Sequence, residues 1–295
     1  MDTTDMKLIM MLSANSRLSY AQLAENLSLS VNAVHKRIQL LLEIGVIKKF
    51  TAKISLYASN AIIVFISGVS ELPSVQDLPE KLKRQGSIYW LAMGGGKYLF
   101  IGANLKNISD LAPLLDYVKT EAGIKEPTAR IMAAPPIAPP KSPETLSDLD
   151  LRIIRSLKDD ARKPIADVAE ELKVSAKTVR RRLDRMTQQN LIELSVEWYP
   201  DKSNDIMTLI DVHLKPEAKL SIASVNLQKH SPNILFFWTF ANLPSMVTYV
   251  VWTNNMNELQ TLREQLEKED GVASIVPNIL YIGYIFETWR DAPLH

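Results

Sequence analysis

The chain has 295 residues, 46% of them hydrophobic and 23% charged, with a net charge of +1. This is the composition of an ordinary globular protein with about two to four domains. It excludes a global attraction to nucleic acid or membrane, so any such attraction must come from local patches. The absence of cysteine excludes disulfides, thiolate metal sites and cysteine nucleophiles. No stretch reaches the ~18 consecutive apolar residues of a membrane span. The acidic N-terminus is unlike a secretory signal, so we expect a cytoplasmic protein.

The first predicted elements belong to a sequence that occurs twice. Shifting the chain by 145 positions aligns residues 5–47 with residues 150–192 without a gap, and about a dozen positions are identical. Identical pairs include Arg17/Arg162, Ser30/Ser175, Val34/Val179 and Arg37/Arg182. A proline-rich segment, 135–146, separates the copies and is typical of an extended linker.

Each copy predicts three helices and a strand. An apolar stripe at helical spacing opens the copy, a short helix follows, and a serine, Ser30 or Ser175, is placed to cap a third helix. A strand-like segment comes next. This order is typical of a winged helix-turn-helix, whose last helix enters the DNA major groove. We therefore predict DNA-binding domains at 1–52 and 147–198.

The third helix of the second copy is strongly basic on its outer side. Val179, Leu183 and Met186 mark its inner face. A step of 100° per residue turns Lys177 and Arg181 outward and Arg180 and Arg185 to the sides, and it places Arg182 near the core edge. A solvated charge run is the common alternative, but the surrounding helix-turn-helix pattern favours contacts with phosphates and guanine. The predicted DNA-binding residues are Ser175, Lys177, Thr178, Arg180, Arg181, Arg182 and Arg185.

The third helix of the first copy is polar and less basic. Asparagine and glutamine suit bidentate contacts with adenine, so this helix is expected to contribute more to base reading than to charge. The predicted DNA-binding residues here are Ser30, Asn32, His35, Lys36, Arg37 and Gln39.

The remaining halves, 53–134 and 199–295, both predict the element order β-α-β-β-α-β. That order is ferredoxin-like, with an antiparallel sheet and two helices on one face. The fold class is therefore α+β, with each winged helix followed by such a regulatory or dimerisation domain. Open sheet faces and edge strands favour pairing with a like domain, so we expect association through these domains and homo-oligomers.

A winged helix-turn-helix followed by a βαββαβ domain resembles the Lrp/AsnC family of prokaryotic transcription regulators. The resemblance covers nearly the whole chain, twice, and rests on residues that include Asp5, Asn15, Leu23, Gly45 and Ile47. It implies a sequence-specific regulator of double-stranded DNA whose C-terminal domains dimerise and bind a small effector. Family members are usually single units that dimerise. Two fused units therefore suggest a pseudo-dimer within one chain, which pairs the winged helices on unlike half-sites or assembles further.

The effector signature of the family is degraded in this chain. Its Gly-x-Tyr-Asp pattern survives only as Gly96-Lys97-Tyr98, with Leu99 in the carboxylate position. Gly94, Gly95 and Gly96 are expected to form a hairpin turn, and together with Lys97 and Tyr98 they are the candidate effector loop. Without the carboxylate an ammonium group lacks its charge partner. We therefore expect no ordinary amino acid to bind; an anion, or an apolar molecule held against the aromatics of the second sheet, is favoured.

Two other function classes remain open. Sirohaem decarboxylases look like paired Lrp/AsnC units, and that chemistry would need histidines and arginines converging on a tetrapyrrole. The four histidines are scattered, no catalytic, metal or nucleotide motif occurs, and a structural His213–Asp211 hydrogen bond is favoured over a catalytic one. We predict no enzyme activity, no cofactor and no metal. The other alternative is a chromatin-type DNA binder with little sequence preference.

Overall fold

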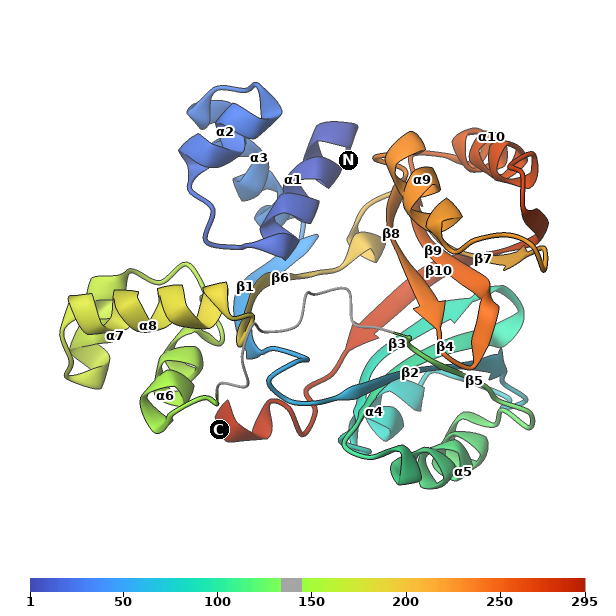
Figure 1. Ribbon diagram of the computed structural model, residues 1–295, viewed down its shortest axis with the longest axis horizontal. Helices are drawn as coiled ribbons and strands as arrows, with labels where there is room; N and C mark the ends of the chain where they lie inside the picture. Colours follow the sequence, from blue (N-terminus) through green and yellow to red (C-terminus); the bar gives the residue numbers. More distant parts are fainter. Residues whose placement is uncertain (134–144, 295) are drawn as a thin grey trace. The chain divides into compact units, whose positions relative to one another are not determined.

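The computed structural model describes residues 1–133 and 145–294, which form two compact units (Figure 1). The winged-helix unit contains residues 1–60, 145–203 and the C-terminal tail 289–294, and the sheet unit contains residues 61–133 and 204–288. Most of the predicted linker, 135–144, lies outside the described residues. The tail, which the sequence analysis assigned to the second βαββαβ domain, belongs to the winged-helix unit because Leu294 enters the core of the second winged helix.

The winged-helix unit holds the three predicted helices of each repeat. They are α1 (Thr3–Ala14), α2 (Tyr20–Leu27), α3 (Val31–Glu43), α6 (Asp148–Leu157), α7 (Ile165–Leu172) and α8 (Ala176–Gln188). Both predicted serine caps are present. The Ser30 hydroxyl accepts from the N–H of Ala33 and the Ser175 hydroxyl from the N–H of Thr178, each at 3.1 Å. Each cap pairs one of the amides that a helix leaves unpaired in its first turn.

The wings of the two repeats pair with each other. Strand β1 (Ile47–Ile54) and strand β6 (Ile192–Trp198) form a two-stranded antiparallel sheet. Phe50 lies opposite Val196 and Thr51 opposite Ser195. Because the repeats are offset by 145 positions, Val196 is the equivalent of Thr51 and Ser195 the equivalent of Phe50. The two central pairs are therefore equivalent, because exchanging the two repeats converts one pair into the other. This is the self-complementary geometry of a two-fold interface.

Each wing also completes the core of the other repeat. Ala52 and Ile54 of β1 pack in the core that α6, α7 and α8 build, whereas Val196 and Trp198 of β6 pack against the core of α1, α2 and α3. The exchange of apolar side chains joins the two winged helices into one compact unit. The sequence predicted both strands but not their exchange.

Two identical arginines join the repeats in a reciprocal way. Arg17 Nη1 donates to the carbonyl oxygen of Ala161 at 2.5 Å, and Arg162 Nη1 donates to the carbonyl oxygen of Ser16 at 2.8 Å. Arg162 and Ala161 are the repeat equivalents of Arg17 and Ser16. Both accepting residues are fully buried, so these charged donors satisfy carbonyl groups that water does not reach.

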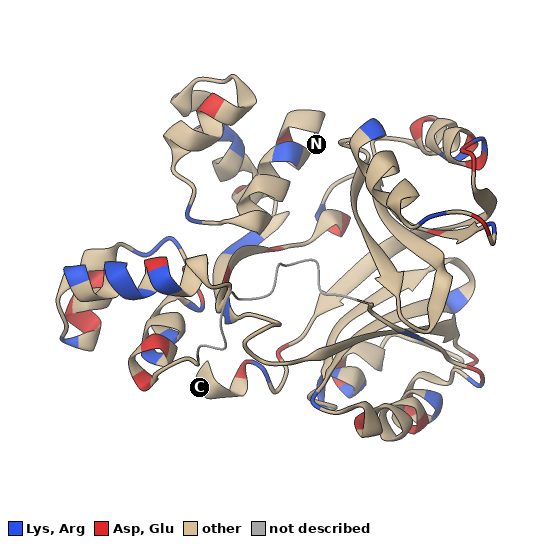
Figure 2. Ribbon diagram, viewed as in Figure 1, with Lys and Arg blue, Asp and Glu red and all other residues tan. Residues whose placement is uncertain are grey.

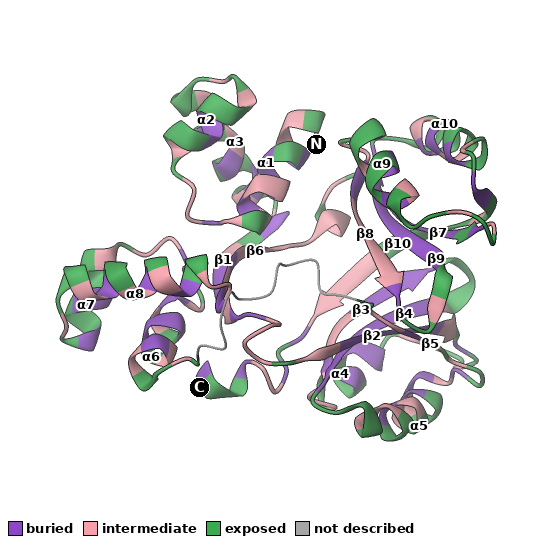
Figure 3. Cartoon of the chain, in the orientation of Figure 1, coloured by how far each residue is buried: buried purple, intermediate pink, exposed green. Residues whose placement is uncertain are grey.

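The sheet unit contains both predicted βαββαβ domains. The first comprises β2 (Ile62–Val69), α4 (Leu78–Lys83), β3 (Ile88–Gly94), β4 (Tyr98–Leu105), α5 (Leu111–Ala122) and β5 (Thr128–Ile131). The second comprises β7 (Ile206–Leu214), α9 (Ser221–Lys229), β8 (Ile234–Phe240), β9 (Leu243–Thr253), α10 (Met256–Glu267) and β10 (Val272–Ile285). Most of β2, β4 and β9 is buried (Figure 3). The α+β fold class is confirmed.

The two four-stranded sheets join into one sheet of eight strands. Its order is β5-β2-β4-β3-β10-β7-β9-β8, so β10 pairs with β3 across the domain boundary. The outermost strands also touch, through a bridge between Met132 and Phe240 and a hydrogen bond from Ala241 N to Ile131 O at 2.8 Å. The edges expected to pair with a like domain therefore pair within this chain.

The sheet face away from the helices is closed by contacts between the two domains. Arg130 binds Asp211 through both carboxylate oxygens at 2.9 Å, and Thr248 donates to the same carboxylate at 2.6 Å. Phe65 stacks on Trp238 with ring centroids 4.2 Å apart. The predicted His213–Asp211 hydrogen bond is wrong, since Asp211 binds Arg130 and Thr248 whereas His213 is exposed.

Candidate nucleic-acid interface

Helices α3 and α8 turn one apolar face into their own winged helix and leave a polar face outside. On α8 the inner face is Val179, Leu183 and Met186, and on α3 the matching face is Val34, Ile38 and Leu41. These six positions repeat at i, i+4 and i+7, which puts them on one side of a helix. The remaining positions include nearly all of the predicted DNA-binding residues.

Three cations of α8 stand free in water. Lys177, Arg180 and Arg181 are exposed and have no ion pair among residues 1–133 and 145–294. Lys and Arg positions occupy much of the ribbon of this helix, as the blue segments of α8 in Figure 2 show. Asp184 is the single acid on the same exposed surface. An unpaired cation loses little when it exchanges water for a phosphate, because no internal ion pair has to break.

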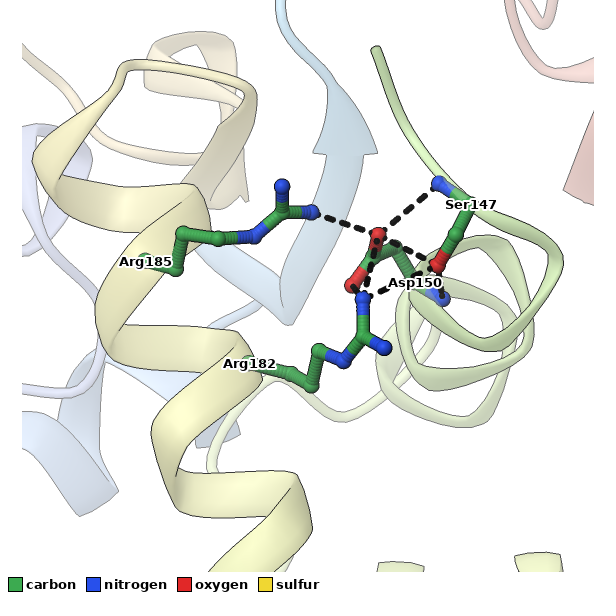
Figure 4. Close-up of polar contacts among 4 residues, drawn as sticks. All are labelled: Ser147, Asp150, Arg182 and Arg185. Atoms are coloured by element: carbon green, nitrogen blue, oxygen red, sulfur yellow. Dashed lines mark hydrogen bonds and ion pairs between the residues drawn. The ribbon is translucent and has the colours of Figure 1, made fainter. Parts of the chain in front are cut away.

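The other two arginines of α8 point instead at a buried carboxylate (Figure 4). Arg185 Nη2 lies 2.6 Å from Asp150 Oδ2 and Arg182 Nη1 lies 3.4 Å from the same oxygen. Asp150 is fully buried and also accepts from the N–H and hydroxyl of Ser147, at 2.8 and 2.7 Å. This cluster ties α8 to the first turn of α6. Both arginines are among the predicted DNA-binding residues, and in this structure their guanidinium groups bind Asp150.

The first repeat has a smaller version of this cluster. Arg37, the equivalent of Arg182, lies 2.6 Å from Asp5 and 2.9 Å from Asp2. The hydrogen bond with Asp5 raises the pKa of Arg37 above its ordinary value. On the outer side of α3, Asn32, His35, Lys36 and Gln39 are exposed, and the His35 ring packs edge-on against Tyr20 with centroids 5.3 Å apart.

The capping serines and Thr178 have local partners as well. Ser175 Oγ lies 2.9 Å from Thr178 Oγ1, while both serine hydroxyls accept from first-turn amides. A hydroxyl can still donate while it accepts, so the cap leaves Ser30 a donor for a phosphate. At α8 one of the two paired hydroxyls, that of Ser175 or that of Thr178, donates to the other, so one donor is left between them.

Arg17 and Arg162, which join the two repeats, are not among the residues predicted to be functional. Burial lowers the pKa of Arg17, and the positive charge of Arg162 lowers it further. Arg162 also lies over the rings of Tyr20 and Phe50, at 4.8 and 5.2 Å from their centroids. Their identity at the same repeat position was the signal that could have marked them as interface residues.

The candidate effector loop forms the turn between β3 and β4. Gly96 has φ +64°, as expected for a tight turn that favours glycine. Lys97 Nζ donates to the carbonyl oxygen of Leu72 at 2.7 Å, and the Tyr98 hydroxyl donates to Ser67 at 3.3 Å. Gly94 is buried, Gly95 is exposed, and Leu99 lies in the core between sheet and helices. The side-chain ammonium of Lys97, the one cation of the candidate effector loop, thus donates to a backbone carbonyl.

These features define a protein that carries two winged helix-turn-helix domains side by side in one chain. A family model described as winged helix-turn-helix DNA-binding matches residues 1–48 and again residues 146–193. The transcriptional regulator LysM of Sulfurisphaera tokodaii is 28% identical over 131 residues, which cover 44% of this chain and 94% of LysM. An uncharacterised HTH-type transcriptional regulator of Pyrococcus furiosus is 33% identical over 102 residues, 34% of this chain and 69% of that protein. The chain belongs to the Lrp/AsnC family of transcription regulators.

A solved structure shares the double arrangement. The sirohaem decarboxylase NirDL, in complex with an iron-uroporphyrin III analogue, aligns with 99% of this chain and 95% of its own, with a TM-score of 0.61 and 11% identity. At this identity the likeness shows the fold alone. Within the described residues, no helix combines the length and the apolar character that crossing a membrane requires.

Proposed function

We propose that the chain is a transcription regulator that binds double-stranded DNA through the outer faces of α3 and α8. The observation that carries this proposal is the set of three unpaired cations, Lys177, Arg180 and Arg181, on the helix that a winged helix-turn-helix lays in the major groove. Arg182 and Arg185 act mainly as internal anchors in this proposal, because Asp150 holds their guanidinium groups. Since the partner is chromosomal DNA of a prokaryotic cell, the proposed location is the cytoplasm.

The two helices are proposed to have different roles in DNA binding: α3 reads bases and α8 supplies most of the charge. On α3 one cation, Lys36, has no ion pair with an acid among the described residues, and it lies beside the amides of Asn32 and Gln39. Amide side chains can pair with adenine, whereas arginine pairs with guanine or phosphate. Because the exchanged wings hold unlike helices together, the preferred site has two different half-sites and is not a palindrome.

Salt-dependent DNA binding tests this proposal. Each phosphate contact contributes about 0.9 to the slope of log K against log salt. Arg180→Ala/Arg181→Ala should therefore lower the slope by up to ~1.8, and Lys36→Ala by at most ~0.9. The control is Lys83→Ala/Arg84→Ala, which removes two exposed cations near α4 in the sheet unit. An unchanged slope in the α8 variant, or an equal change in the control, contradicts the proposal.

The alternative of low-specificity binding is tested with the same protein. Selection of bound sequences from random DNA should return one asymmetric motif if α3 reads bases. A chromatin-type binder would return no motif, and a palindrome would show that identical helices from two chains face the DNA.

The likeness to NirDL makes an enzyme of the decarboxylase class the second candidate function. The described histidines lie on separate elements: His35 on α3, His213 on β7 and His230 at the end of α9; His295 lies outside the described residues. We propose that the chain is not an enzyme. Titration with an iron tetrapyrrole tests this: no Soret shift is expected, and a saturable shift would favour the decarboxylase class.

An effector and association between chains are two further proposals. Gly94, Gly95, Gly96, Lys97 and Tyr98 remain the candidate effector loop, and we propose that ordinary amino acids do not bind there, since Leu99 replaces the expected carboxylate. Calorimetric titration with the twenty amino acids checks this, and micromolar binding of any of them would contradict it. Homo-oligomers through the βαββαβ domains remain a proposal that sedimentation equilibrium measures.

A further inference from the structure

The two wing strands carry opposite charge. Strand β1, Ile47–Ile54, contains three lysines and no acid, whereas β6, Ile192–Trp198, contains two glutamates and no base. The pair of strands therefore sums to +1, from +3 and −2. Two copies of β1 would sum to +6 and two copies of β6 to −4.

The register of the wings places these charges against each other. Lys49 lies opposite Glu197 and Lys53 opposite Glu193. Glu197 also lies 3.3 Å from Lys48 Nζ and 3.8 Å from Lys49 Nζ. Its side chain is only 11% exposed, so these charges are less screened by salt than those of a surface pair.

The second glutamate is neutralised from the C-terminal tail. Arg290 Nη2 lies 3.2 Å from Glu193 Oε1 and donates to the carbonyl oxygen of Ile54 at 2.5 Å. The N–H of Leu56 donates to the same glutamate at 2.9 Å. One guanidinium thus contacts both wing strands, and it adds a second charge contact that requires β1 and β6 to be partners.

Pairing between identical repeats would lose these contacts. The register sets Lys53 opposite Glu193, which is the repeat equivalent of Lys48. In β1 a bulge between Ile47 and Lys49 sets Lys48 out of this register. A pair of two first wings in the regular register of β6 would place Lys48 opposite Lys53 at both ends, and like charges directly opposite destabilise a strand pair. In a pair of two second wings, Glu197 would face Leu194, with no lysine in either strand.

We propose that the wings form a charge code that makes each winged helix complementary to the other repeat and not to itself. The partner of the first repeat is then the second repeat, and association of like repeats between chains is selected against by repulsion as well as by lost attraction. The code keeps one weakly basic and one strongly basic recognition helix together in every winged-helix unit. It does not depend on what those helices bind.

The absence of cysteine in the sequence allows a direct test in the full chain. Ala21→Cys and Ala166→Cys place spin labels at equivalent exposed positions of α2 and α7. The distance distribution between the labels should be single and narrow in the parent. Lys48→Glu/Lys49→Glu puts acids against Glu197 and Asp159, the acid that Lys49 contacts at 2.5 Å, and should broaden it. Adding Glu197→Lys/Asp159→Lys restores opposite charges and should narrow it again.

A control variant distinguishes the effect of charges in the wings from the effect of the net charge of the chain. Lys7→Glu/Lys83→Glu makes the same change in net charge at exposed positions outside the wings, and it should leave the distribution narrow. An unchanged distribution in Lys48→Glu/Lys49→Glu overturns the charge code. It is equally overturned if the fourfold variant stays broad, or if the control broadens as much.

Discussion

Asparagine in place of Asp150 should destabilise the winged-helix unit strongly. The carboxylate of Asp150 is fully buried, and it faces Arg185 at 2.6 Å and Arg182 at 3.4 Å. Asparagine keeps the shape and the acceptor for Ser147 but removes the negative charge, so two guanidinium groups remain beside a neutral amide.

The expected loss of unfolding free energy depends on how far Arg182 and Arg185 are exposed to water. Breaking a fully buried ion pair by removing one partner costs about 3–5 kcal/mol. The side chains of Arg182 and Arg185 are 30% and 29% exposed, so they can turn partly into water. We therefore expect the free energy of unfolding to fall by about 2–3 kcal/mol, below the range for a fully buried pair.

The first repeat provides the matched control. Asp5→Asn removes the equivalent carboxylate, but Arg37 keeps Asp2 at 2.9 Å, and Asp5 is 13% exposed. Because Arg37 still has Asp2 as a partner, the cost should be about 1 kcal/mol, as for the loss of one hydrogen bond. Urea unfolding gives the free energies, and hydrogen exchange in α6 and α8 locates the effect. Equal costs for Asp150→Asn and Asp5→Asn would refute the reasoning.

Sequence periodicity was sufficient for the elements and for the internal repeat. Val34 and Val179 marked the buried faces of α3 and α8, and the serines before them marked the helix starts, because both signals act over a few residues. The βαββαβ order was predicted for the same reason. Domain boundaries were harder: nothing in the local sequence signalled that Leu294 packs in a winged-helix core.

Contacts between elements are where sequence reasoning failed. The helical wheel places Arg185 on the side of α8 but contains no information on α6, whose buried Asp150 binds that side chain. The exchange of wings was missed for a similar reason: a strand pattern predicts a pairing edge but not its partner. The ion pair between the first and third helices did have a signal in the sequence, because Asp5/Asp150 and Arg37/Arg182 are both identical between the repeats.

Three further predictions concern buried charge. Asp211→Asn should cost about 3–5 kcal/mol because it leaves Arg130 unpaired, whereas replacing both by leucine and methionine should be nearly neutral in thermal unfolding; equal losses would contradict this. Burial and then Lys229 lower the pKa of His230 below 6.5, so its neutral form stabilises the fold above that pH and stability falls as the pH drops below it. His230→Gln should flatten this fall in urea unfolding measured as the pH is lowered from 6.5, and an unchanged fall would mean that another group causes it. Arg17→Ala and Arg162→Ala should each cost about 1.5–3 kcal/mol, the range for hydrogen bonds from charged groups. The two guanidinium groups repel each other. Each single variant removes this repulsion, so the sum of the two single effects counts the relief twice, whereas the double variant gains it only once. The double variant should therefore lose more stability than the sum of the singles, with an excess that shrinks as salt rises. An additive pair at low salt would show that the arginines do not interact across the repeats.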